Sequence, residues 1–365
     1  RLRHAIVGHA VCCRRALQMR RFHALAAHAL VTGTPSQLGF GLLALYLVAK
    51  PVEASAGSER FARFALASII AGGCATAMSQ SLGASGGVTG SGALVYARAF
   101  TANIARRKME EHGHPESAVR TVSAWPETVT AGPFTVGFAP ISHSIPESSG
   151  LVIDTPHGRV VHTGDFKLDR APGVGEPFDD DMWADIAKDG VQALVCDSTN
   201  VFSPGQSGSE GEILDSMTEV ISGAPGRVAV ACFATNVARL ETISRAAQET
   251  GRHVVLAGRS LWRIQTAARE NGYLADIPPF LDEADVDNLP DDKVLIICTG
   301  SQGEPRAALS RIASGDHPRV SLGEGDWVIF SSREIPGNET SISRLQNDLV
   351  ARGVRIITSR DAFVH

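Results

Sequence analysis

The sequence predicts an α/β protein built around a mostly parallel sheet. Strand-like and helix-like runs alternate beyond about residue 205. Four or five successive βα units of this kind are typical of a parallel sheet covered by helices. The 365 residues allow two domains, and the hydrophobic fraction of 44% and charged fraction of 20% are those of a globular chain.

The elements of this alternating region are read from their apolar runs and intervening turn residues. The predicted strands are 227–233, 253–258, 293–300, 326–332 and 354–359, and the predicted helices are 236–251, 260–272 and 339–353. The loops after the strands read FATN, GRS, CTGSQGEP and SSREIPGNE. Ligands usually bind beyond the carboxyl ends of such strands, and these loops are rich in groups suited to phosphate.

A second set of elements precedes residue 205. A helix is predicted at about 99–111, strands at 132–139, 151–154 and 158–162, a helix at 179–190, and a buried strand in VQALVCD, residues 191–197. These runs predict a separate sheet-containing region.

The first 95 residues differ from the rest. They hold nine Lys or Arg and two acids, whereas the remainder holds 25 Lys or Arg and 37 acids. Their longest apolar run, from about residue 38, is shorter than the ~20 residues that a membrane-spanning helix needs. The six cysteines show no disulfide-framework spacing and favour a reducing cytoplasm without membrane attachment.

Seven motifs carry a family resemblance. They are HSIPES, HTGDFKLD, CDSTNVFSPGQSGSE, CFATN, GRS, CTGSQGEPRAALSRIASGDH and SSREIPGNE. In this order they resemble the ribonuclease J family, metallo-β-lactamase-fold nucleases with an inserted β-CASP domain. The resemblance runs from about Tyr96 to His365. It implies a partial metallo-β-lactamase αββα sandwich over 96–205 and a Rossmann-like β-CASP domain, incomplete at its end, over 206–365; residues 1–95 have no counterpart.

The resemblance assigns roles to three residues that alone would read as turn or capping residues. It implies that His143 is a metal ligand and that Asp165 bridges two zinc ions, with a catalytic role. It also implies that Asp197 is catalytic and supports proton transfer. His162 is better interpreted as a strand residue or a supporting partner.

The expected zinc centre is incomplete. Two-metal phosphodiester hydrolysis requires a full ligand set for both ions. The resemblance implies four ligands from an H-x-H-x-D-H motif, which occurs nowhere in this sequence. We interpret the His112–His114 run as the end of a helix, not as a substitute. We therefore expect this chain, as given, not to hydrolyse RNA.

The candidate substrate-binding residues lie in the loops after the predicted strands. By resemblance they are Phe233, Ala234, Thr235, Ser301, Ser331, Ser332 and His365. Phe233 could instead belong to the core. A locally basic groove is expected from Arg239, Arg259, Arg306 and Arg333.

The resemblance implies a zinc-dependent ribonuclease, both endonuclease and 5′–3′ exonuclease, that acts on RNA and assembles as a dimer or tetramer. The alternatives are a non-catalytic RNA-binding β-CASP protein and another metallo-β-lactamase-fold hydrolase, acting on another phosphodiester or ester. Residues 1–95 are either genuine or read out of frame; the charge break favours the second interpretation.

Overall fold

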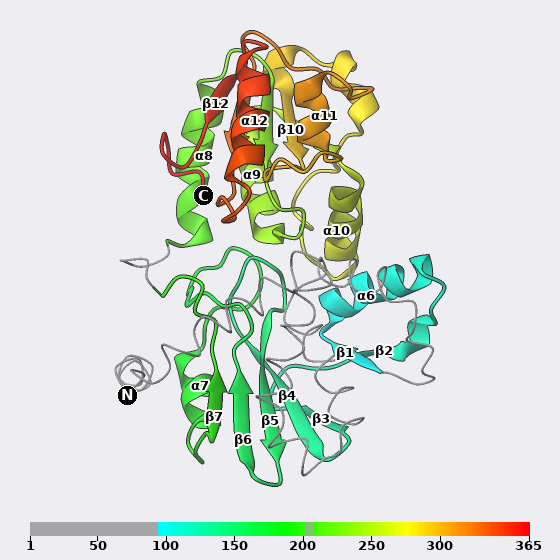
Figure 1. Cartoon of the computed structure of the whole chain (residues 1–365), viewed down its shortest axis with the longest axis vertical. Helices are drawn as coiled ribbons and strands as arrows, with labels where there is room; N and C mark the ends of the chain where they lie inside the picture. The colour runs from blue at the N-terminus through cyan, green and yellow to red at the C-terminus, as the bar shows by residue number, and fades with distance from the viewer. Residues whose placement is uncertain (1–93, 202–204, 206–207) are drawn as a thin grey trace. The chain divides into compact units, whose positions relative to one another are not determined.

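The computed structural model describes residues 94–201, 205 and 208–365. They fall into two compact units (Figure 1). Of the described residues, unit one holds 94–140, 149–165 and 179–198, and unit two holds the rest, including the short segments 141–148 and 166–178. No helix in the described part of the chain is long and apolar enough to cross a membrane.

Unit one begins with a small βαβ arrangement. Strand β1 (Val95–Ala97) pairs in parallel with β2 (Val119–Thr121), and helix α6 (Ala99–Glu111) lies between them in the chain. The predicted helix at 99–111 is confirmed. His112 follows as its C-cap, with its ring Nδ1 2.9 Å from the Lys108 carbonyl oxygen, so the HGH run does end a helix.

The main sheet of unit one has the order β3-β4-β5-β6-β7. Its strands are β3 (Thr128–Ala131), β4 (Phe134–Pro140), β5 (Ser149–Thr155), β6 (Gly158–His162) and β7 (Ala193–Val195). The first four pair antiparallel, and β7 pairs in parallel with β6. Phe134, Phe138 and Leu151 are buried members of its core.

Helix α7 (Asp180–Ile186) is fixed by capping and by one tryptophan. The Asp179 side chain accepts from the N–H groups of Asp181 and Met182, which explains the acidic run at this helix start. The indole N–H of Trp183 donates to the Pro140 carbonyl oxygen at 3.1 Å. Its ring lies against Gly150, where a Cβ would come within 2.7 Å.

The predicted buried strand at 191–197 is wrong in one respect. The strand exists as β7, but all three of its residues are exposed. Leu194 is 50% and Val195 49% exposed. The physical reason is position: within the described residues β7 lies at the edge of the sheet and pairs only with β6, so its side chains have fewer neighbours than those of a central strand.

Unit two contains a five-stranded, fully parallel sheet with the order β12-β11-β8-β10-β9 (Figure 1). The strands are β8 (Val228–Ala231), β9 (His253–Ala257), β10 (Val294–Cys298), β11 (Trp327–Phe330) and β12 (Arg355–Ile357). The helices are α8 (Ile213–Ser222), α9 (Val237–Glu249), α10 (Arg259–Glu270), α11 (Ala308–Ser314) and α12 (Glu339–Val350). All five strands and three helices predicted here are confirmed.

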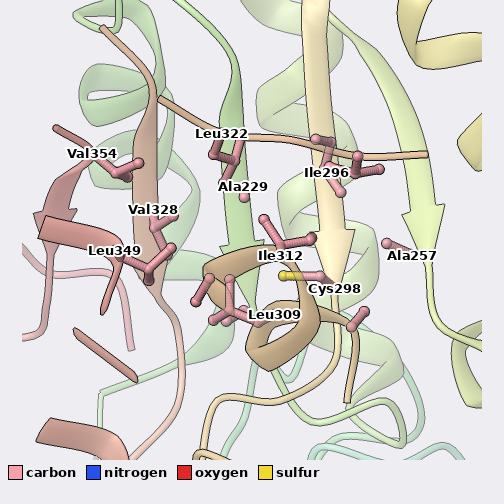
Figure 2. Close-up of a cluster of buried hydrophobic side chains, with 14 of the residues drawn as sticks. Ala229, Ala257, Ile296, Cys298, Leu309, Ile312, Leu322, Val328, Leu349 and Val354 are labelled. Carbon is pink, nitrogen blue, oxygen red and sulfur yellow. The ribbon is translucent and has the colours of Figure 1, made fainter. Parts of the chain in front are cut away.

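The centre of this sheet is buried on both faces. Every residue of β10 is inaccessible to solvent, as expected for a central parallel strand. Figure 2 shows Ile296 and Cys298 of β10 in one cluster with Leu309 and Ile312 of α11 and Leu349 of α12. This packing fixes the strand ends from which the loops of the candidate site emerge.

Candidate nucleic-acid interface and metal ligands

The carboxyl edge of the unit-two sheet brings four motifs together. Strand β8 lies between β10 and β11, so the FATN loop emerges between the GSQGEP and SSREIPGNE loops. The chain steps to one side of β8 and then to the other, which creates the topological switch point where ligands bind in open parallel sheets. The sequence prediction of a polar loop cluster at this edge is confirmed.

Arg239, in the first turn of α9, is the centre of this edge and is fully buried. Its Nε and Nη2 donate to the two carboxylate oxygens of Glu210 at 3.1 and 2.9 Å. Its Nη1 lies 2.5 Å from Ser331 Oγ and 3.1 Å from the Val364 carbonyl oxygen. The guanidinium is therefore held by the protein, and the expectation that Arg239 faces an RNA groove is wrong.

The other three arginines differ from Arg239. Arg259, Arg306 and Arg333 are exposed. Arg333 Nη1 donates to the Asn200 side-chain oxygen at 2.7 Å, which joins the SSREIPGNE loop to the CDSTN motif. These three positions remain predictions for a basic groove.

Two predicted substrate-binding residues are tied to the buried arginine. Ser331 is 1% exposed, and its hydroxyl donates to the Val364 carbonyl oxygen at 2.7 Å. His365 Nδ1 lies 3.1 Å from Arg239 Nη1 and must accept from it. Burial, followed by the charge of Arg239, lowers the pKa of His365 to about 4. The imidazole is therefore neutral at pH 7.

Gln302 organises the two neighbouring loops. Its side-chain N–H groups donate to the Arg333 carbonyl oxygen at 2.8 Å and to Ser332 Oγ at 3.3 Å. Its side-chain oxygen accepts from the Ile335 N–H at 2.9 Å and the Asn338 amide at 3.4 Å. A buried amide with each side satisfied fixes the shape of the SSREIPGNE loop.

A polar cavity of about 270 Å³ opens beside these loops. Ser301, Ser332 and Arg333 line one part of it, and Thr358, Ser359 and Arg360 another. Two guanidinium groups and several hydroxyls can donate to phosphate oxygens, and the carboxylate of Glu334 also lines the cavity. Ser301 and Ser332, both predicted from sequence, thus lie at a cavity with suitable chemistry.

The predicted nucleotide-contacting triplet forms the turn between β8 and α9. Phe233, Ala234 and Thr235 are each partly exposed. The following Asn236 is buried and caps α9 by accepting from the Arg239 N–H at 2.8 Å. Phe233 is neither a fully buried core ring nor fully exposed, and base stacking by it stays a prediction.

The candidate ligand His143 lies in the 141–148 segment of unit two. Its ring Nδ1 is 3.1 Å from Ser144 Oγ. The Ala238 N–H donates to the Ser144 carbonyl oxygen at 3.4 Å, so the segment contacts the first turn of α9. Tyr273 Oη lies 3.4 Å from Glu147, which has a positive φ of 58°. His143 therefore belongs structurally with the loops described above.

Asp165 and Asp197 lie in unit one, beyond the carboxyl ends of the parallel pair β6 and β7. Thr163 joins these ends, because its N–H donates to the Val195 carbonyl oxygen at 2.9 Å and its Oγ1 accepts from the Asp197 N–H at 3.0 Å. His162 Nδ1 accepts from the Gly164 N–H at 2.9 Å. Burial lowers the pKa of His162, against the charge of Asp165, so this ring is neutral and forms part of the turn.

The predicted zinc centre can be tested against these positions. Among the residues that the structure describes, no three or more His, Cys, Asp or Glu side chains come together as a metal site. His143 and Asp165 also belong to different units. The roles of His143 and Asp165 as metal ligands stay predictions.

Sequence reasoning missed Asp169 of the HTGDFKLD motif. Its carboxylate accepts from the Ala171 N–H at 2.9 Å and the Ser209 hydroxyl at 2.9 Å, and lies 3.5 Å from Lys167 Nζ. Burial raises its pKa, yet these bonds and the lysine outweigh burial and hold the pKa below its usual value. Asp169 and its partner Glu210 anchor the 166–178 segment within unit two. The only sequence signal for these two residues is that each lies in one of the seven family motifs.

Comparison with known proteins gives matches for most of the chain. A family model described as Ribonuclease J, beta-CASP domain, matches residues 225–349. Ribonuclease J of Sinorhizobium meliloti is 42% identical over 74% of this chain, and that of Thermus thermophilus is 39% identical over 74%. Ribonuclease J 1 of Streptococcus pyogenes is 41% identical over 74%. Each alignment covers 48% of the relative, so the chain spans about half the length of these proteins.

A second family model, described as Rhomboid domain, matches residues 19–120. Most of this range lies outside the described residues, and its last part covers β1, α6 and the start of β2. Residues 1–95 are interpreted above as an out-of-frame translation. The interpretation itself stays a prediction.

A solved structure of a protein of unknown function from Enterococcus faecalis is also similar. Its TM-score is 0.49 at 13% identity, over 73% of this chain and 63% of that one. The family relationship rests on the sequence matches instead. A ribonuclease J β-CASP model over 225–349, together with curated ribonuclease J relatives at 39–42% identity over 74% of the chain, shows that the matched region belongs to the ribonuclease J family.

Proposed function

We propose that this chain carries the RNA-binding part of a ribonuclease J-type hydrolase, an enzyme that cleaves RNA phosphodiester bonds in endonuclease and 5′–3′ exonuclease modes. The observation that carries the proposal is the polar cavity at the carboxyl edge of the unit-two sheet, in the region that matches the ribonuclease J β-CASP domain. Its donors suit a phosphate chain, and the relatives are named ribonucleases.

The roles of individual residues follow from their placement. Arg333, Arg360, Ser301 and Ser332 would bind backbone phosphates at the cavity, since guanidinium groups and hydroxyls provide charge-assisted and neutral donors. Phe233, with Ala234 and Thr235, would contact a base, because the partly exposed aromatic side chain could stack on a base of single-stranded RNA. Ser331 and His365 would act by holding the loop through Arg239.

Hydrolysis in such an enzyme depends on metal, which we take to be zinc. In the proposal His143 and Asp165 bind metal and Asp197 supports proton transfer. Because the described residues do not assemble a metal site, we propose that the 365-residue chain binds RNA without cleaving it efficiently. The remaining ligands would come from residues other than those that the structure describes.

Fluorescence anisotropy with a 5′-monophosphorylated RNA oligonucleotide tests the binding proposal. We expect saturable binding that weakens with salt, as phosphate contacts require. Arg360→Gln should weaken it about tenfold, the size expected for a lost charge-assisted bond. Arg245→Gln is a matched control, because Arg245 pairs with Glu241 within α9. Equal affinity of Arg360→Gln and the parent chain would contradict the assignment of the cavity.

Measurements on the same purified chain distinguish two further candidate functions. A non-catalytic RNA-binding protein is favoured by the lack of a metal group in the described region, and two zinc ions per chain in elemental analysis would argue against it. A hydrolase of other esters would prefer small esters or DNA in a substrate panel. We also propose a cytoplasmic location, from the cysteine pattern, and a homodimer or homotetramer, which light scattering would detect.

A further inference from the structure

Glu334 is the only carboxylate among the described residues that line the polar cavity of unit two. The guanidinium groups of Arg333 and Arg360 line the same cavity, and they donate hydrogen bonds without accepting any. An ionised carboxylate does the reverse and only accepts. It would repel a phosphate group beside it. A cavity that held phosphate alone would therefore gain nothing from an acidic side chain at this position.

The main chain at Glu334 is held from both sides by one buried side chain. The amide N–H of Gln302 donates to the carbonyl oxygen of Arg333 at 2.8 Å, and its side-chain oxygen accepts from the N–H of Ile335 at 2.9 Å. These are the residues directly before and after Glu334. Glu334 itself is exposed, so its carboxylate is accessible to a ligand while its backbone is fixed.

Two buried serines that line the cavity have their hydroxyl hydrogens available. Ser332 Oγ accepts from the side-chain N–H of Gln302 at 3.3 Å, and Ser301 Oγ accepts from the same nitrogen at 3.5 Å. Because the oxygens accept these bonds, each hydroxyl can donate its own hydrogen to another group, such as a phosphate oxygen. The cavity thus combines donors for phosphate with one fixed acceptor.

The backbone of RNA offers such an acceptor one kind of partner. Within the chain, the phosphate oxygens and the ring oxygen of the sugar only accept hydrogen bonds, whereas the ribose 2′-hydroxyl can also donate. The backbone of DNA lacks this donor. At about 270 Å³ the cavity approaches the ~300–1,000 Å³ of small-molecule sites, so it has room for a ribose beside a phosphate.

We propose that Glu334 accepts a hydrogen bond from a ribose 2′-hydroxyl while the serines and arginines of the cavity hold the adjoining phosphate. Glu334 is then the residue by which this cavity distinguishes RNA from DNA. On DNA the same carboxylate would lie beside phosphate with no donor to bind. The inference rests on the proposed function, RNA binding at this cavity, and adds the group that selects the sugar.

Fluorescence anisotropy with two oligouridylates of equal length tests this inference. One is RNA, and the other carries 2′-fluoro ribose at every position. Fluorine keeps the sugar shape close to that of RNA but has no hydrogen to donate. Both carry a 5′-hydroxyl and are measured at one salt concentration, since phosphate contacts depend on salt, with EDTA present to prevent cleavage. We expect the 365-residue chain to bind the RNA about fivefold more tightly, as one charge-assisted bond to an exposed group allows.

Three variants assign this preference to its source. Glu334→Ala should bring the ratio of the two affinities close to one, partly because the 2′-fluoro chain no longer meets a repelling charge. Glu334→Gln should give an intermediate ratio, since its amide oxygen still accepts. Glu324→Ala is the matched control: it removes an equal charge from an exposed position before β11, at the amino edge of the sheet, and should leave the ratio unchanged. Unfolding temperatures establish that the variants are folded.

Equal affinity of the parent chain for both oligonucleotides would overturn the role of Glu334. So would a ratio that stays at the parent value in Glu334→Ala. In either case, weaker RNA binding by Arg360→Gln would leave the RNA-binding function of the cavity standing. Absence of saturable RNA binding by the parent chain would overturn both.

Discussion

Arg239 and Glu210 form a two-bond ion pair inside unit two, with the arginine side chain almost completely removed from solvent. The pair joins the first turn of α9 to the 3₁₀ turn at Glu210–Glu212, and the same guanidinium reaches Ser331 and Val364. One buried cation thus connects the FATN, SSREIPGNE and C-terminal loops. Arg239 therefore affects the candidate RNA site by holding these loops in place.

Replacing Arg239 with Met should destabilise unit two by about 3–5 kcal/mol, because Glu210 would remain buried without its partner. Urea unfolding followed by tryptophan fluorescence measures this loss, with Trp262 and Trp327 as probes in unit two. The double variant Arg239→Met with Glu210→Leu should recover part of it, since no charge is then left unpaired. Arg259→Met is the control: Arg259 is exposed, so this variant should change the free energy of unfolding by no more than about 0.5 kcal/mol. An equally small loss in Arg239→Met would contradict the structural role of Arg239.

Glu147 should tolerate glycine better than valine. Its φ of 58° lies in the left-handed region, which costs a β-branched residue of order 1–3 kcal/mol and glycine almost nothing. Glu147→Val should therefore lower the unfolding temperature clearly more than Glu147→Gly. Tyr273→Phe is the control, because it removes the hydroxyl near Glu147 and leaves the backbone unchanged. Equal effects of the valine and glycine variants would show that φ does not matter here.

The parallel sheet of unit two could be predicted because each strand is a short apolar run with a turn signal behind it. Helices α8 and α11 were not singled out, since their apolar residues share no clear boundary with the neighbouring loops. Sequence could place Ser301 and Ser332 at the carboxyl edge, because all strands of a parallel sheet end at that edge and each serine follows a predicted strand. It could not show that Arg239 is buried while Arg333 is exposed, because burial depends on partners far away in the chain.

The site in unit one shows the same limit. The runs at 158–162 and 191–197 were read as strands correctly, and they bring Asp165 and Asp197 to one edge. The apolar residues of VQALVCD predicted burial, yet β7 is exposed, since within the described residues it is an edge strand that pairs only with β6. Asp169 escaped notice because a buried, hydrogen-bonded carboxylate has the same sequence signature as a turn aspartate.

Unit two should lose stability as the pH falls below about 6.5. His365 has its pKa lowered to about 4 by burial and by Arg239, with Arg333 and Lys167 acting in the same direction and Glu210 opposing. Between these values the unfolded chain binds a proton that the folded chain does not, so stability rises with pH across this window and is lost on acidification. His317, whose pKa burial also lowers, adds to the same slope.

Thermal unfolding of unit two at several pH values from about 4 to 7.5 measures this slope. His365→Asn should make it shallower, because asparagine does not titrate. His157→Asn is the control, since His157 is exposed in a turn of unit one. An unchanged slope in His365→Asn would show that the imidazole is not held neutral by the fold.

Gln302→Ala should weaken RNA binding, because this side chain holds the SSREIPGNE loop in shape. The substitution removes the side chain that accepts from the Ile335 N–H and donates to the Arg333 carbonyl oxygen, and it leaves both partners without that bond. A buried group without its bond costs about 1–3 kcal/mol, which the loop can avoid only by changing shape. Because Ser332 and Arg333 line the cavity, a changed loop alters the phosphate donors directly.

The measurement is RNA affinity by anisotropy together with unfolding temperature, under conditions where both variants are folded. Gln346→Ala is the matched control. Gln346 also lines the cavity, but it lies on helix α12, so its truncation should leave the shape of the SSREIPGNE loop unchanged. We expect Gln302→Ala to reduce affinity about tenfold, the equivalent of about 1.4 kcal/mol, and Gln346→Ala to reduce it less. If the two variants bind RNA equally well, the SSREIPGNE loop does not depend on Gln302 for its binding shape, and the phosphate donors must lie elsewhere on this edge.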